Sequence, residues 1–108
     1  MPSESALAAG LSELMVLRLL REQEMYGYEI VQAIAIRTRK ALTPGEGVIY
    51  PLLHALEKDG LLKSRRKTVG GRSRIYYSLT ARGAKRLAAM TDHWQALTGA
   101  VGAVLHAV

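Results

Sequence analysis

Cysteine is absent from this 108-residue sequence, and so is any apolar run long enough to cross a membrane. The missing cysteine excludes disulfide bonds and thiolate metal sites, and it is compatible with a reducing compartment. The least polar stretch, "ALTGAVGAVLHAV", falls short of the about 20 apolar residues that a bilayer requires. The first residues also lack a basic stretch before an apolar run, so a secretory signal is not expected. We therefore expect a cytoplasmic protein.

Side-chain constellations that support catalysis or metal binding are missing as well. The three histidines are His54, His93 and His106, and none has an acid or another histidine at ligand spacing. No Ser-His-Asp set, carboxylate pair or phosphate-binding glycine loop can be assembled from the other residues. The sequence predicts a protein that is not an enzyme and that holds neither a metal nor a cofactor.

Acidic residues are scarce in the middle of the chain, where basic residues gather. Between residues 58 and 86 the only acid is Asp59, against ten lysines and arginines. No lysine or arginine follows Arg86, and the formal net charge of the chain is +6. A cationic block inside a folded domain favours a polyanionic partner, either nucleic acid or an anionic membrane. A solvated surface explains the charge equally well on this observation alone.

Apolar periodicity predicts two helices in the first part of the chain. Residues 11–20, "LSELMVLRLL", are apolar on more than one face, which is typical of a helix buried on two sides. From Gly27 onward, Ile30, Val31 and Ile34 repeat at helical spacing. Cations at residues 37–40 suit the C-terminal end of this second helix, because they complement its dipole.

A third helix is predicted from the capping pattern in "TPGE". Thr43 would be the N-cap, Pro44 the first helical residue and Glu46 the acid of a capping box. Pro51 fits poorly inside a regular helix, because it lacks an amide donor and crowds the carbonyl four residues back. A helix that starts near Gly47 is therefore the alternative. The apolar stripe of this helix consists of Ile49, Leu52, Leu53 and Leu56.

The segment 62–79 predicts a β-hairpin. "RSRIYYSL" alternates strictly, and "LLKSRRKT" before it can pair with it in the antiparallel sense. Gly70 and Gly71 fit the positive φ that a tight hairpin turn requires. The cations are then left on a ribbon that faces solvent. The inward side consists of Ile75, Tyr77 and Leu79, and the outward side of Arg74, Tyr76 and Ser78.

A final helix is predicted from Thr80, which can serve as its N-cap. Apolar residues at alternating three- and four-residue spacing form a heptad seam, which predicts a dimer interface with a two-fold related copy. Leu11 and Leu14 of the first helix are expected beside this seam. The near absence of cations in the helix argues against a membrane surface. The seam consists of Leu87, Met90, Trp94, Leu97, Val101, Val104 and Val108.

Three helices, a basic hairpin and a long helix describe a winged helix-turn-helix. The predicted fold class is mainly α with a small β-hairpin: a winged-helix DNA-binding domain over residues 1–80, with its wing at about 62–79, and a C-terminal dimerisation helix over 81–108. A helix fits the major groove of double-stranded DNA, and a cationic ribbon can hold the flanking phosphates. A winged helix that binds an acidic protein partner is the alternative. The expected DNA-binding residues are Tyr26, Thr43, Gly47, Val48, Tyr50, Pro51, His54, Lys58, Arg65, Arg66, Lys67, Arg72, Arg74 and Tyr76.

Three blocks of the sequence, in matching order and spacing, resemble the PadR family of bacterial transcriptional regulators. They are "YGYEI" (residues 26–30), "GVIYPLLHALEKDGLL" (residues 47–62) and "GGRSRIYYSLTARG" (residues 70–83). The resemblance implies a winged-helix domain, a single C-terminal helix that dimerises, and repression from a pseudo-palindromic operator.

The resemblance and the positions of the tyrosines in the predicted elements indicate a role for each of them. The resemblance implies that Tyr26 and Tyr50 belong to the DNA-facing or domain-supporting surface. Tyr28 and Tyr77 are expected at the core or its edge, because amphipathic rings pack well with the hydroxyl at the surface. Tyr76, on the outward side of the hairpin, suits either a DNA contact or packing.

Two further residues keep alternatives open. Trp94 lies in the middle of the seam, and in this family such a position can border a cavity that accepts a planar aromatic effector; a packed core residue is the other interpretation. Glu46 departs from the expected pattern, because an acid just before the DNA-reading face would repel phosphate unless it caps the helix.

Overall fold

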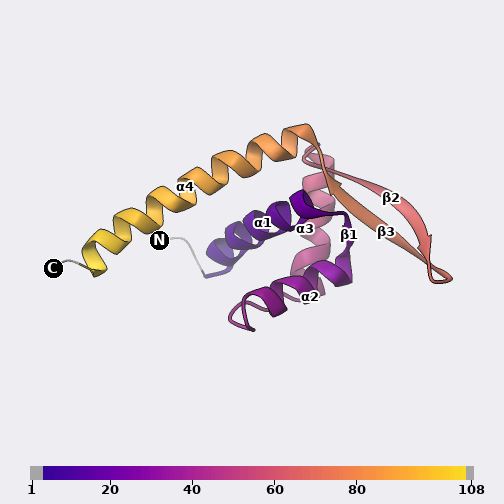
Figure 1. The fold of residues 1–108 in the computed structure, drawn as a ribbon, viewed down its shortest axis with the longest axis horizontal. Coiled ribbons are helices and arrows are strands. Elements are labelled where there is room, and N and C mark those ends of the chain that lie inside the picture. Colours follow the sequence, from indigo (N-terminus) through magenta and orange to yellow (C-terminus); the bar gives the residue numbers. More distant parts are fainter. Residues whose placement is uncertain (1–3, 107–108) are drawn as a thin grey trace.

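The computed structural model describes residues 4–106, with side chains from residue 10 onward, and it confirms the predicted winged helix-turn-helix (Figure 1). The chain is mainly α, with a hairpin between its third and fourth helices, and one short strand that the sequence did not predict. Val108, predicted in the dimer seam, lies outside the described residues. The elements are α1 (Glu4–Glu22), β1 (Met25–Tyr26), α2 (Gly27–Arg37), α3 (Glu46–Lys58), β2 (Leu62–Val69), β3 (Arg72–Leu79) and α4 (Ala81–Leu105).

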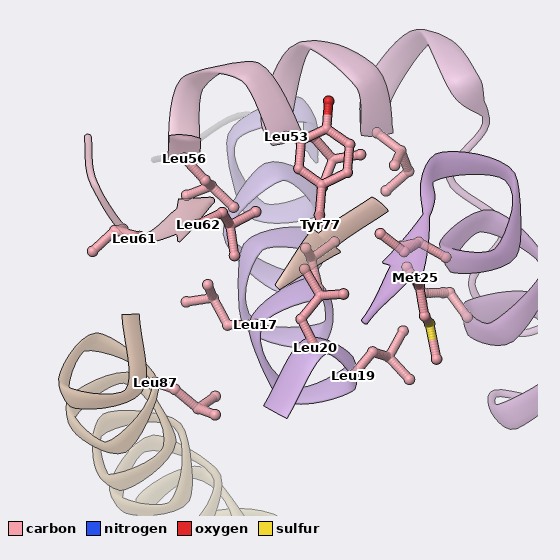
Figure 2. Close-up of a cluster of buried hydrophobic side chains, with 14 residues drawn as sticks. Leu17, Leu19, Leu20, Met25, Leu53, Leu56, Leu61, Leu62, Tyr77 and Leu87 are labelled. Carbon is pink, nitrogen blue, oxygen red and sulfur yellow. The ribbon is translucent and has the colours of Figure 1, made fainter. Parts of the chain in front are cut away.

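The core lies where α1, α2 and α3 meet the base of the hairpin (Figure 2). α1 is central, because it contacts α2, α3, β3 and α4, and this explains why its sequence is apolar on two faces. Leu17 is fully buried in the same cluster as Leu53 of α3 and Leu62 of β2. Burying one such leucine contributes about 1.5–3 kcal/mol to folding. Tyr77 is also buried, as predicted, and joins the hairpin to this core.

The three strands form one antiparallel sheet in the order β1-β3-β2. The hairpin register pairs Leu62 with Leu79 and Val69 with Arg72, so that the two strands match over their full length. Gly70 and Gly71 have φ values of 60° and 78°, which confirms the predicted glycine turn. β1 adds to the free edge of β3, with Met25 opposite Tyr77. The hairpin projects from the helical body as a wing (Figure 1).

The start of α3 corrects the predicted capping box. α3 begins at Glu46 with Gly45 as N-cap, so Thr43 is not the N-cap and Pro44 is not the first helical residue. The preceding turn is organised by Thr38, whose hydroxyl accepts from the Leu42 amide at 3.1 Å. Pro51 is thus the sixth residue of the helix. This start is close to the predicted alternative, a helix that begins near Gly47.

α4 is fixed to the body at its first turn. Thr80 caps the helix as predicted, because its hydroxyl accepts from the Gly83 amide at 3.0 Å, and it also donates to the Gly60 carbonyl at 2.7 Å. Gly83 packs on the Leu61 carbonyl so closely that a Cβ would clash with it. Leu87, predicted in the dimer interface, is 1% exposed and packs instead within the core of its own protomer.

The second half of α4 extends away from the wing, and its axis runs roughly along that of α1 (Figure 1). With 25 residues the helix is about 37 Å long. From Trp94 onward its large apolar side chains are exposed, and Val104 reaches 77%. Within residues 4–106 no helix has the length and apolar character needed to span a bilayer.

Candidate nucleic-acid interface

α3 divides into a buried face and an exposed face. Ile49, Leu53 and Leu56 are buried against the core, as the helical spacing predicted. The opposite side projects into solvent and carries hydrogen-bonding side chains in the first half of the helix and one cation, Lys58, in its last turn. We refer to it as the exposed face of α3, and it consists of Gly47, Val48, Tyr50, Pro51, His54 and Lys58.

A hollow of about 490 Å³ separates α3 from the wing. Its walls come from β1 and the start of α2, from residues 46–54 of α3 and from residues 72–77 of β3, so residues far apart in sequence meet there. Phenol rings and guanidinium groups dominate the lining. This α3–wing hollow is lined by Tyr26, Gly27, Tyr28, Glu46, Tyr50, His54, Arg72, Arg74, Ile75 and Tyr77.

Tyr50 forms the corner of the hollow between α3 and α2. Its ring lies against Gly27, where a Cβ would come within 2.6 Å of Cε1. Tyr50 is nevertheless 37% exposed, so one edge of the ring faces solvent. Burial raises the pKa of the Tyr77 phenol, and the charge of Glu57 raises it further. Tyr77 therefore stays neutral at the floor of the hollow, as a hydrogen-bonding group rather than a charge.

Arg74 is positioned by an aromatic ring. Its guanidinium lies over the ring of Tyr26, 4.4 Å from the centroid, which is a cation–π contact. Tyr26 in turn meets Tyr76 edge to face at 5.4 Å, and Lys67 lies over the Tyr76 ring, 4.7 Å from its centroid. These contacts leave Tyr76 only 8% exposed, which favours packing over the alternative of a DNA contact. Tyr76 packs against the ring of Tyr26, its partner in the strand register, and against the Lys67 ammonium group.

Two of the predicted phosphate-binding cations are held by an acid that sequence reasoning did not single out. Glu24 accepts from Arg65 at 2.7 Å and from Lys67 at 2.6 Å, reaching across the sheet from the end of α1. The hydrogen bond from Arg65, followed by that from Lys67, lowers the pKa of Glu24 to about 2. The strand register puts these cations on the face of Tyr76, whereas Arg66 lies opposite Ile75 on the other face. Arg66 and Arg72 are exposed.

Other predicted positions are distributed as follows. Thr43 is exposed in the turn before α3, outside the hollow. Tyr28 is 50% exposed, so of the two predicted places, the core or its edge, the structure excludes the buried core. The signal was available, because Tyr28 lies off the stripe of Gly27, Ile30 and Ile34 that packs inward. Among the side chains of residues 10–106, no group of three His, Asp or Glu residues is arranged to hold a metal ion.

A second, apolar groove lies on the side of the molecule away from the wing. It occupies about 330 Å³ between α1, α2 and the middle of α4. Leu14 of α1 lines the groove. Leu11, also in α1, and Met90 in α4 are half-buried. Trp94 is 42% exposed one helical turn beyond Met90. The predicted seam therefore begins in the core and continues as a free apolar face, formed by Trp94, Leu97, Val101 and Val104.

Known proteins share both this sequence pattern and this fold. Residues 16–89 match the family model described as the transcriptional regulator PadR-like family. Transcriptional regulator Rv3488 of Mycobacterium tuberculosis is 36% identical over 84 residues, covering 78% of this chain and 73% of that protein. The structure of smu.1704 from Streptococcus mutans UA159 is 31% identical with a TM-score of 0.84, covering 92% of this chain and 90% of that one. A PadR family transcriptional regulator from Eggerthella lenta DSM 2243 is 32% identical with a TM-score of 0.80, covering 94% and 88%.

Proposed function

The chain belongs to the transcriptional regulator PadR-like family, and on that premise we propose that it is a sequence-specific, double-stranded DNA-binding repressor of the cytoplasm. One observation carries the proposal: the α3–wing hollow brings the exposed face of α3 and the wing arginines to the same surface. A helix with exposed donors fits the major groove, and arginines beside it reach the flanking phosphates.

The roles within this surface follow from chemistry. Tyr50 and His54 carry hydrogen-bonding groups on the exposed face of α3, so they are assigned to base edges. Arg72 and Arg74 line the wing side of the hollow and are assigned to phosphates. Arg65 and Lys67 are given a lesser role, because Glu24 already holds them. Residues 1–80 then form the DNA-binding domain, completed by the buried first turns of α4.

The free apolar face of α4 supports a homodimer. Leu97, Val101 and Val104 are each about half exposed or more, and such a stripe is stable in water when a second copy covers it. A two-fold dimer presents two copies of α3 to half-sites ~34–36 Å apart, which is the spacing of a pseudo-palindromic operator. Residues 81–108 are thus assigned to dimerisation.

Val101→Glu tests the dimer, because it places a charge in the middle of the free apolar face. Gln95→Glu is the matched control, since it adds the same charge to an exposed position of α4 outside the seam. Sedimentation of the protein with a duplex from upstream of its own gene should give two protomers per duplex for the control. Val101→Glu should sediment as a monomer and lose DNA affinity. Two protomers per duplex with Val101→Glu would contradict the assigned interface.

Release by a planar aromatic effector is the regulatory part of the proposal. Trp94 lies on the free face, where two copies of the ring can border a shared space across the dyad. Binding of a flat aromatic compound should quench Trp94 fluorescence and lower the affinity for DNA in parallel. Quenching without any change in DNA affinity, across a broad panel of compounds, would contradict the switch.

A reporter gene behind the protein's own upstream region tests repression itself. Expression should fall when the protein is supplied and recover with a variant that lacks both Arg72 and Arg74. Increased expression with the intact protein would identify an activator instead.

A further inference from the structure

Glu46 is the one acid among the residues that line the α3–wing hollow. It occupies the first turn of α3, beside Tyr50 and His54 on the helix and across from Arg72 and Arg74 of the wing. Its side chain is exposed rather than buried. A carboxylate on a surface proposed to bind a polyanion is unfavourable unless it meets a hydrogen-bond donor there.

The fold makes no specific use of this carboxylate. Gly45 is the N-cap of α3, and its carbonyl, not a side chain, accepts from the amides of Val48 and Ile49 at 3.0 Å. Among the side chains described, those of residues 10–106, the Glu46 carboxylate has no hydrogen-bond or ion-pair partner, although two arginines share its hollow. A negative charge in the first turn does suit the helix dipole. That benefit does not depend on facing the hollow.

Other glutamates of the chain have a hydrogen-bonding partner for the carboxylate, and Glu46 differs from them in this respect. Glu13 pairs with Arg86 at 3.2 Å, and Glu24 with Arg65 at 2.7 Å. Glu29 accepts from the Tyr26 amide at 3.1 Å. Each of these carboxylates stabilises a contact between elements, whereas Glu46 leaves its acceptor oxygens free toward the hollow.

Base chemistry identifies a matching donor. An ionised carboxylate only accepts hydrogen bonds. In the major groove, the exocyclic amino group of cytosine is the donor that pairs with Asp or Glu. The first turn of the second helix of a helix-turn-helix is where base edges are contacted. We infer that Glu46 reads a cytosine in each half-site, accepting from its N4 amino group; the inference rests on the DNA-binding function proposed above.

Selection from a randomised duplex library tests the inference with three proteins. The wild-type chain should enrich cytosine at one position of each half-site. Glu46→Ala should lose that preference about tenfold while keeping the other positions, which is the scale of one base contact. Glu46→Gln should move the preference to adenine, because a glutamine side chain pairs with adenine in two hydrogen bonds.

Asp59→Asn is the matched control, since it removes an exposed acid from the other end of α3, outside the hollow. It should leave every base preference unchanged. If both Glu46 variants bind all duplexes more tightly with the same consensus as the wild type, the carboxylate only repels phosphate and the inference is overturned. If the wild-type chain enriches no consensus at all, the proposal of sequence-specific DNA binding is wrong, and the inference that Glu46 reads cytosine is wrong with it.

Discussion

The phenol ring of Tyr50 lies against Gly27, so that a Cβ added at residue 27 would fall 2.6 Å from Cε1 and 2.9 Å from the hydroxyl oxygen. This contact joins the two helices of the helix-turn-helix at the corner of the α3–wing hollow. Glycine is required there by close approach rather than by backbone conformation. The position of an exposed, proposed DNA-contacting ring is thereby set by a buried residue on another helix.

Gly27→Ala should weaken DNA binding while preserving the fold. The added methyl group meets the outer atoms of a side chain that can rotate away, so the cost to stability is small. The displaced Tyr50 ring should lower affinity for the operator about tenfold, which corresponds to one misplaced contact. Thermal melting and anisotropy titration measure the two effects. Gly10→Ala, where a Cβ meets nothing within 4 Å, is the control. Unchanged affinity would mean that the orientation of Tyr50 does not matter.

Glu24 should titrate far below an ordinary glutamate. Its pKa is lowered to about 2 by Arg65 and Lys67, against roughly 4.3 in an unfolded chain. The folded-state pKa is the lower one, so the ion pairs stabilise the wing above roughly pH 4.3 and are lost as the pH falls toward 2. Carboxyl chemical shifts followed by NMR should give a midpoint near 2. A midpoint close to 4 would show that the cations do not hold Glu24 in solution.

Arg74→Ala should reduce the salt dependence of DNA binding. If Arg74 meets one phosphate, its removal lowers the slope of log K against log salt by about one. Arg65→Ala should change the slope less, because Glu24 already holds that guanidinium in an ion pair at 2.7 Å. Titrations on one duplex at several salt concentrations give both slopes. Equal changes for the two variants would show that Glu24 releases Arg65 to DNA.

Thr80→Ala should destabilise the protein by about 1–2 kcal/mol, because an N-cap is lost together with a tie to the base of the wing. Urea unfolding measures the loss. Thr80→Ser keeps the hydroxyl and should retain most of the stability. A serine variant as unstable as the alanine variant would assign the effect to the lost methyl group instead.

Local sequence patterns predicted much of the fold, since the helices, the hairpin and its glycine turn each have a short-range signature. Side chains that depend on a distant partner were not predictable in this way. Tyr76 alternates outward along β3, yet the Tyr26 ring and Lys67 pack against it. Leu87 continues the heptad spacing of α4, but spacing does not distinguish packing within a protomer from packing between protomers. Glu24 reaches Arg65 from 41 residues away, and no periodicity reports such a pair.

The central claim is sequence-specific DNA binding, and a fluorescence-anisotropy titration at near-physiological salt tests it most directly. It compares a duplex from upstream of the protein's own gene with a scrambled duplex of equal length. We predict a preference of about 10³-fold or more for the upstream duplex, within the usual specific range. Weak and equal binding to both duplexes would contradict the claim and favour an acidic protein as the partner of the wing.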